Sequence, residues 1–109
     1  MSNKPALLGL LATLTLFTSL PALAEVDGQQ LYRQHCAKCH AADGRANTLR
    51  GWLYFAQNRS KAKWQDSNSD SDILDAIAKG PGAMPGYADK LSATEQLALV
   101  KAVRDLRKP

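Results

Sequence analysis

Two cysteines and a histidine stand within five consecutive residues, and this motif constrains the chain more than any other feature. It reads Cys36-Ala37-Lys38-Cys39-His40. On a helix, positions i, i+3 and i+4 lie on one face, so the two thiols and the imidazole would point the same way. Such thiols can form thioether bonds to the two vinyl groups of one haem, with the imidazole directed at the iron. The motif therefore predicts a haem attached through Cys36 and Cys39, with His40 as an axial ligand.

Three other chemistries use paired cysteines, and the sequence disfavours each of them. A zinc site needs four ligands, usually from two separated pairs, whereas the chain has no other cysteine and its only other histidine is the adjacent His35. A thioredoxin-like redox pair needs a βαβ context, which this strand-poor sequence lacks. A disulfide between the two cysteines would close a very small, strained loop. Haem attachment is the leading interpretation.

The first 24 residues have the pattern of a secretory signal peptide. Lys4 supplies a short basic region, residues 6–17 are apolar, and residues 21–24 end in an A-x-A cleavage pattern. We expect cleavage after Ala24, which would leave residues 25–109 as one exported, periplasmic domain. The alternative is an uncleaved membrane anchor, although the apolar stretch is shorter than the roughly 20 residues that span a bilayer.

The domain that remains is small for a self-sufficient hydrophobic core. Chains of this size often need a staple, and a covalently held haem would supply a large apolar body. We therefore expect the chain without haem to be poorly folded. The whole chain carries a net charge of +4, but its basic residues are scattered rather than interleaved with aromatic side chains, which argues against nucleic acid as a partner.

Hydrophobic periodicity and capping patterns predict an all-α domain of about four short helices. The first is expected over about 28–37, with Asp27 as its N-cap, and a second, short helix over 49–57. A third helix begins near Ser71 and ends at Gly80, with an apolar stripe of Ile73, Leu74 and Ile77.

The last predicted helix covers about 93–107. Ser92 and Glu95 form a capping box at its start. Its apolar face is expected to comprise Leu97, Val100 and Val103.

Met84 is the candidate for the second axial ligand. Met1 would leave with the signal peptide, so Met84 is the only thioether in the mature chain, and it lies in a loop rich in Gly and Pro. His35 would lie about 100° around the helix from the attachment face, from which it cannot readily reach the other side of the haem. The alternative for a lone methionine is to fill a gap in the core. A Met/His pair leaves no open site for a substrate.

These residues together resemble the small bacterial class I cytochromes c, similar to the cytochrome c551/c552 and c5 groups. The likeness begins at Gly28 in the N-terminal helix, continues through the haem motif and Met84-Pro85, and ends in the helix that follows Leu91. The resemblance implies a class I cytochrome c fold whose N- and C-terminal helices cross. It also implies one covalently bound haem c per chain, with a partly exposed haem edge.

The chain departs from this family in one respect. Family members often have a proline shortly after the haem motif, in the loop whose carbonyl accepts a hydrogen bond from the proximal histidine, but here no proline lies between His40 and Pro81. We expect a carbonyl near Thr48 or Leu49 to serve instead. Four aromatic residues are candidate hydrogen-bond donors to the haem propionates, with core packing as the alternative: Trp52, Tyr54, Trp64 and Tyr87.

The resemblance and the absence of an acid–base pair or nucleophile indicate a one-electron carrier rather than an enzyme. Its expected partners are redox proteins: a reductase or dehydrogenase as donor and an oxidase or reductase as acceptor. No membrane span would remain after signal cleavage. Two alternatives stay open, a haem subunit of a larger oxidoreductase complex and a gas-binding or sensing haem protein in which Met84 is displaced.

Overall fold

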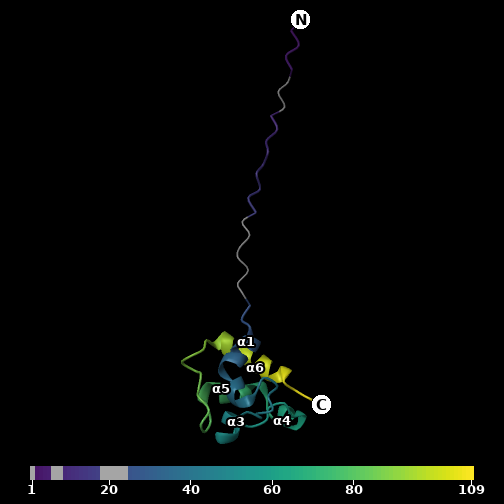
Figure 1. Ribbon diagram of the computed structural model, residues 1–109. Coiled ribbons are helices and arrows are strands. Elements are labelled where there is room, and N and C mark those ends of the chain that lie inside the picture. The colour runs from purple at the N-terminus through teal and green to yellow at the C-terminus, as the bar shows by residue number, and fades with distance from the viewer. Residues whose placement is uncertain (1, 6–8, 18–24) are drawn as a thin grey trace.

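In the described part of the chain, helices joined by loops begin at residue 28. The computed structural model describes residues 2–5, 9–17 and 25–109 (Figure 1), and β-type pairing within them is limited to one isolated bridge between Lys61 and Lys108. These residues form six helices, compared with the four expected: α1 (Gly28–His35), α2 (Ala37–His40), α3 (Leu49–Leu53), α4 (Ala62–Ser67), α5 (Asp70–Lys79) and α6 (Ala93–Asp105).

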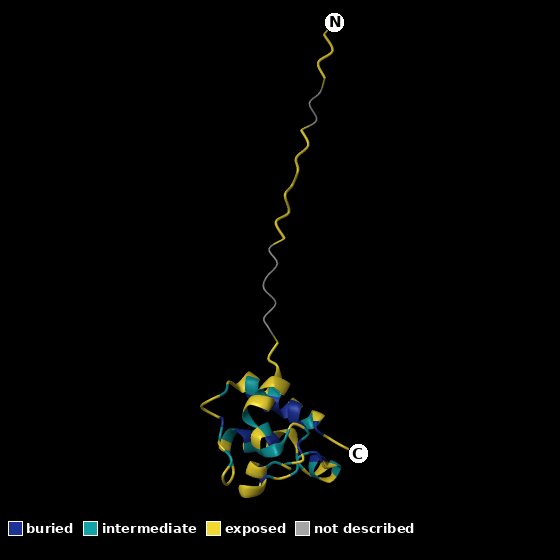
Figure 2. Cartoon of the chain, in the orientation of Figure 1, coloured by how far each residue is buried: buried dark blue, intermediate teal, exposed yellow. Residues whose placement is uncertain are grey.

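The segment predicted to be a signal peptide has no helix in its described residues. Residues 9–17 are exposed (Figure 2), and Leu11 and Phe17 are each 92% accessible to solvent. The predicted cleavage site at residues 21–24 lies outside the described residues. Among the helices that can be described, none is both long and apolar enough to cross a membrane.

The core lies where α1, α5 and α6 meet. Helices α1 and α6, from the two ends of the domain, pack against each other (Figure 1), and α5 packs against α6. Nine buried apolar side chains form this core in the described residues: Tyr32, Ile73, Ile77, Tyr87, Leu99, Val100, Ala102, Val103 and Leu106. The all-α class I fold that the sequence predicted is confirmed.

The predicted apolar face of the last helix was wrong at one position. Leu97 is 58% exposed, whereas Leu99 is fully buried. The buried stripe therefore runs through Leu99, Val100 and Val103, which follow the i, i+1, i+4 spacing of one helix face. The predicted start of α6 is confirmed: Ser92 and Glu95 form a reciprocal capping box.

Helix α5 begins and ends at residues that stop a helix locally. Ser69 caps its start and exchanges hydrogen bonds with Asp72, so only two residues separate α5 from the end of α4. At its other end Gly80 adopts a left-handed conformation, with φ of 66°, which glycine tolerates without a Cβ clash. The predicted stop at Gly80 is therefore confirmed.

Candidate functional site

The Cys36–His40 motif lies at a break between two helices rather than inside one. The helix predicted over about 28–37 ends at His35, and α2 begins at Ala37, with Cys36 as the cap of both. The backbone N–H of His40 donates to the carbonyl of Cys36 at 2.9 Å, and that of Cys39 donates to the same carbonyl at 3.2 Å. These bonds form one helical turn. Residues at i, i+3 and i+4 of such a turn lie on one face, as predicted for the two thiols and the imidazole.

Both thiols of the motif are free and half-buried. Burial, with a smaller contribution from the nearby Cys39, raises the pKa of the Cys36 thiol to about 11. Cys36 is therefore a neutral thiol near pH 7. Two unpaired thiols on one turn are the groups that thioether attachment to haem requires.

The imidazole of His40 is held by a backbone carbonyl in the segment before α4. Its Nδ1 lies 2.9 Å from the carbonyl oxygen of Gln57. Because a carbonyl can only accept, Nδ1 carries the proton and Nε2 keeps a lone pair for a metal. Burial lowers the pKa of His40, which the bond to Gln57 opposes only in part, so the ring is neutral, as a ligand must be.

The prediction that a carbonyl near Thr48 or Leu49 accepts a hydrogen bond from His40 was wrong. Thr48 has a different role. Its hydroxyl lies 2.9 Å from the carbonyl oxygen of Cys39 and 3.1 Å from that of Lys38, to which it donates. The same oxygen accepts the backbone N–H of Gly51 at 2.9 Å. Thr48 thus closes the last turn of α2 and caps the first turn of α3.

A glycine brings α3 against the haem motif. A Cβ at Gly51 would lie 2.3 Å from the carbonyl oxygen of Cys39, much closer than two such atoms can approach. Helix α3 ends at Leu53, earlier than the predicted residue 57, and Phe55 follows with a positive φ of 56°. The chain then continues in non-helical form to Gln57, where its carbonyl faces His40.

Met84 lies in the loop between α5 and α6, which runs beside α5 in Figure 1 (green). Within the loop, a hydrogen bond from the Met84 N–H to the Pro81 carbonyl at 3.2 Å closes a tight turn. It is tied to α5 where Tyr87 N–H donates to the Ile77 carbonyl at 2.9 Å. Met84 is half-buried, and its role as a ligand stays a prediction.

The aromatic candidates for propionate contacts and His35 differ in their burial and in their contacts. Tyr87 is buried, and its hydroxyl donates to the His35 carbonyl at 3.2 Å, so its single hydrogen is not available to a propionate. The ring of His35 packs edge-on against that of Tyr87, with centroids 5.3 Å apart. Trp64 lies under the guanidinium of Arg59 at 4.3 Å. Trp52 is 74% exposed.

The residues of the motif fit a covalently bound haem. They provide two free thiols on one turn and a neutral imidazole whose Nε2 is left unprotonated by the bond to Gln57. Sequence reasoning identified these side chains but missed Gln57. No sequence signal could have found it, because any residue type carries a carbonyl.

Comparison with known proteins agrees with this site. Residues 24–101 match the family model described as Cytochrome C oxidase, cbb3-type, subunit III. The chain is also similar to a solved structure, KustC0563 c-type cytochrome, at 39% sequence identity and a TM-score of 0.70. That similarity covers 76% of this chain and 100% of the other.

Two curated relatives are both named Cytochrome bc1 complex cytochrome c subunit. The protein from Corynebacterium efficiens is 31% identical over 86 residues, covering 75% of this chain and 27% of the relative. The protein from Corynebacterium diphtheriae is 30% identical over 81 residues, covering 73% and 26%. The chain thus spans about a quarter of the length of these relatives. Since the family match covers most of the chain, the protein belongs to the cytochrome c family described as Cytochrome C oxidase, cbb3-type, subunit III, and its cofactor is covalently bound haem c.

Proposed function

We propose that the protein is a periplasmic one-electron carrier. One haem per chain would be attached through Cys36 and Cys39, with His40 and Met84 as its axial ligands. The bound haem supplies one-electron exchange between ferric and ferrous iron. The observation that carries the proposal is the bond between His40 Nδ1 and the Gln57 carbonyl, which leaves Nε2 free for iron.

The loop that carries Met84 supports the assignment of the second ligand. Backbone hydrogen bonds to α5 hold the chain on both sides of Met84, because Gly80 N–H donates to the Ala76 carbonyl and Tyr87 N–H donates to the Ile77 carbonyl. Met84 is also the sole methionine outside the proposed signal peptide. A sulfur ligand opposite an imidazole raises the reduction potential relative to two nitrogen ligands, and it occupies the position that a gas molecule would need.

Export is proposed from the N-terminal pattern. The basic Lys4, the apolar residues 6–17 and the A-x-A pattern ending at Ala24 support removal of residues 1–24 as a signal peptide. The cytochrome c domain would then comprise residues 25–109. N-terminal sequencing of the haem-containing protein from the native cell tests this boundary, and a mature chain that retains Lys4 would contradict it.

Substitution of each axial ligand tests the proposed function. His40→Ala should abolish the low-spin spectrum of the purified protein, whereas His35→Ala is the matched control and should leave it unchanged. Met84→Ala should remove the weak far-red sulfur-to-iron band of the ferric protein and should let the ferrous protein bind carbon monoxide. Wild-type protein that binds carbon monoxide quickly and completely at neutral pH would instead support the gas-binding alternative.

A haem subunit of a larger complex is the second candidate function, and one observation favours it: two relatives are named Cytochrome bc1 complex cytochrome c subunit. The curated relatives named as bc1 complex subunits are about four times as long as the matched region. Helix α3 and the residues after it expose large apolar side chains: Leu49 at 75%, Trp52 at 74%, Leu53 at 55% and Phe55 at 90%. These residues belong to, or directly follow, the helix that packs on the haem motif, so the haem and a partner protein are both candidates to cover them. Co-purification with a partner at high salt would favour the subunit, and a monomer that exchanges electrons in solution would favour the carrier.

A further inference from the structure

The Gln57 carbonyl that holds His40 belongs to a segment with little apolar packing of its own. Residue 57 is exposed. The segment that contains it is held in place by Arg59, two residues further along the chain. The Arg59 backbone N–H donates to the Gly44 carbonyl at 2.8 Å, and its guanidinium donates to the side-chain oxygen of Gln57, also at 2.8 Å. Arg59 therefore links the loop after the haem motif to the residue that contacts the proximal histidine.

The carbonyl of Arg59 is held in turn by Gln65, a buried residue of α4 that is 4% exposed. The side-chain nitrogen of Gln65 donates to the Arg59 carbonyl at 2.7 Å and to the Val103 carbonyl at 2.9 Å. These two bonds use both hydrogens of the amide. One side chain thus fixes the Gln57–Arg59 segment to helix α6.

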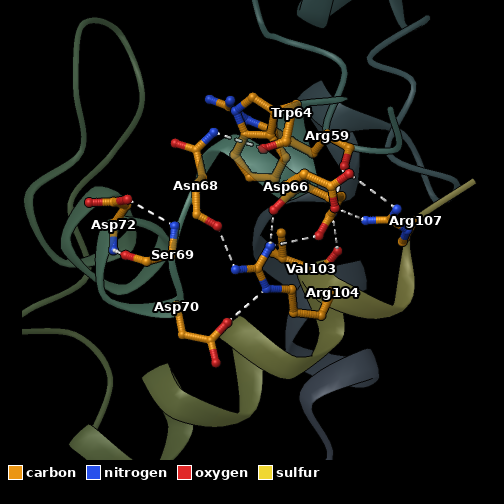
Figure 3. A network of polar contacts seen from close by, with 11 residues as sticks. Arg59, Trp64, Asp66, Asn68, Ser69, Asp70, Asp72, Val103, Arg104 and Arg107 are labelled. Atoms are coloured by element: carbon orange, nitrogen blue, oxygen red, sulfur yellow. Dashed lines mark hydrogen bonds and ion pairs between the residues drawn. The ribbon is translucent and has the colours of Figure 1, made fainter. Parts of the chain in front are cut away.

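Arg104 of α6 fixes the orientation of that amide. Its guanidinium donates to the side-chain oxygen of Gln65 at 3.0 Å and to the backbone carbonyl of the same residue at 2.7 Å. It also donates to the Asn68 carbonyl at 2.6 Å and pairs with Asp70 at 2.7 Å (Figure 3). With its oxygen occupied by a cationic donor, Gln65 can present only its nitrogen to the two carbonyls.

We propose that Gln65 is a positioning residue for the haem ligand: it holds the Gln57 carbonyl against His40 through Arg59, and so tunes the reduction potential. This inference rests on the proposed role of His40 as an iron ligand. A carbonyl that accepts from Nδ1–H makes the imidazole a stronger electron donor, which favours ferric iron. Loosening the segment weakens that bond, so the potential rises.

Gln65→Met in the haem-containing protein tests the proposal, because methionine keeps the length and volume of the side chain but cannot donate. Two quantities are measured: the reduction potential, and the exchange rate of the His40 Nδ1 proton by NMR in the ferrous protein. We expect the potential to shift upward and the proton to exchange on the order of tenfold faster, as expected when the buried hydrogen bond to the Arg59 carbonyl is lost.

Gln96→Met is the matched control. Gln96 is the other buried glutamine of the described residues, 8% exposed, and it donates to the Leu91 carbonyl at 2.9 Å, at the opposite end of α6 from Val103. It should lower stability without changing the potential or the proton exchange. Equal shifts in the two variants, or no shift in Gln65→Met, would overturn the proposal.

A second variant covers the case in which Gln65→Met does not fold. Arg104→Lys leaves Gln65 in place but cannot contact all the acceptors that the guanidinium holds, and it should shift both quantities in the same direction to a smaller extent. Wild-type protein without histidine-ligated iron in its spectrum would contradict the proposed function itself. Wild-type protein with that ligation, and no shift in the variants, would contradict only the role of Gln65.

Discussion

Removing the hydroxyl of Thr48 should destabilise the haem motif by an amount that the structure defines. Thr48→Val keeps the shape of the side chain but removes the N-cap of α3, a loss of about 1 kcal/mol. It also removes the bond to the carbonyls at the end of α2. The hydroxyl has one hydrogen, so the two nearby carbonyls share it and count as one bond of about 1 kcal/mol. The free energy of unfolding should therefore fall by about 2 kcal/mol.

This loss corresponds to a decrease in Tm of about 8–16 °C for a domain of this size. Thermal unfolding of the ferric haem-containing protein, followed by circular dichroism, measures it. Thr48→Ser retains the hydroxyl and should recover most of the stability. Thr94→Val makes the same chemical change on the exposed first turn of α6 and should have little effect. If Thr48→Val is as stable as wild type, or if the serine variant is equally damaged, the reasoning about this cap is wrong.

Three further substitutions test other parts of the structure. Leu99→Ala should cost about 2–5 kcal/mol in denaturant unfolding, whereas Leu97→Ala on the same helix should change stability by less than about 0.5 kcal/mol. Gly51→Ala should destabilise despite a gain of about 1 kcal/mol in helix propensity, because the added Cβ meets a backbone carbonyl that cannot move aside, and thermal unfolding measures the net effect. The N-terminal cap of α5 holds the pKa of Asp72 below its ordinary range, so its stabilisation is complete above about pH 4 and is lost as the pH falls further. Asp72→Asn should remove that part of the pH dependence in unfolding measured from pH 6 to pH 2.

Helix ends that are marked by a capping side chain or by a glycine could be predicted from the sequence. The Ser92–Glu95 box identified the start of α6, and Gly80 identified the end of α5. Helix α4 was missed because neither signal is present in it. Its N-cap residue, Lys61, makes no side-chain capping bond, and its buried residue is the polar Gln65. A short helix that buries an amide instead of an apolar stripe has no hydrophobic periodicity to detect.

In the site, side chains that are close in the sequence were predicted, and the contact between residues far apart in the sequence was not. Cys36, Cys39 and His40 are close in the sequence, so their spacing alone indicated a shared face. The break at Cys36 was not predicted, because no proline or glycine marks it. The acceptor for His40 was placed near Thr48 and proved to be Gln57, 17 residues away from the histidine, since the position of a backbone carbonyl depends on the path of the whole intervening loop.

The distribution of buried residues shows that, apart from the haem, the site half of the domain is held by polar contacts. None of the nine core residues in the described chain comes from the stretch 33–72. The residues that are buried there are small or polar: Gly44, Gly51, Ser60 and Gln65. Each hydrogen bond that holds them contributes only about 1 kcal/mol, whereas burial of one large apolar side chain contributes about 1.5–3 kcal/mol.

Local opening should therefore be easier in this stretch than in the helices of the core. In the haem-containing protein, amide hydrogen exchange should be fastest over residues 41–68 and slowest in α1, α5 and α6, where the core lies. Mass spectrometry of deuterated peptides measures this order. The terminal turns of all helices fray and are excluded from the comparison. Uniform protection across both regions would mean that the haem, polar contacts and glycine packing together hold the site as firmly as apolar burial holds the core, and would refute this division of the domain.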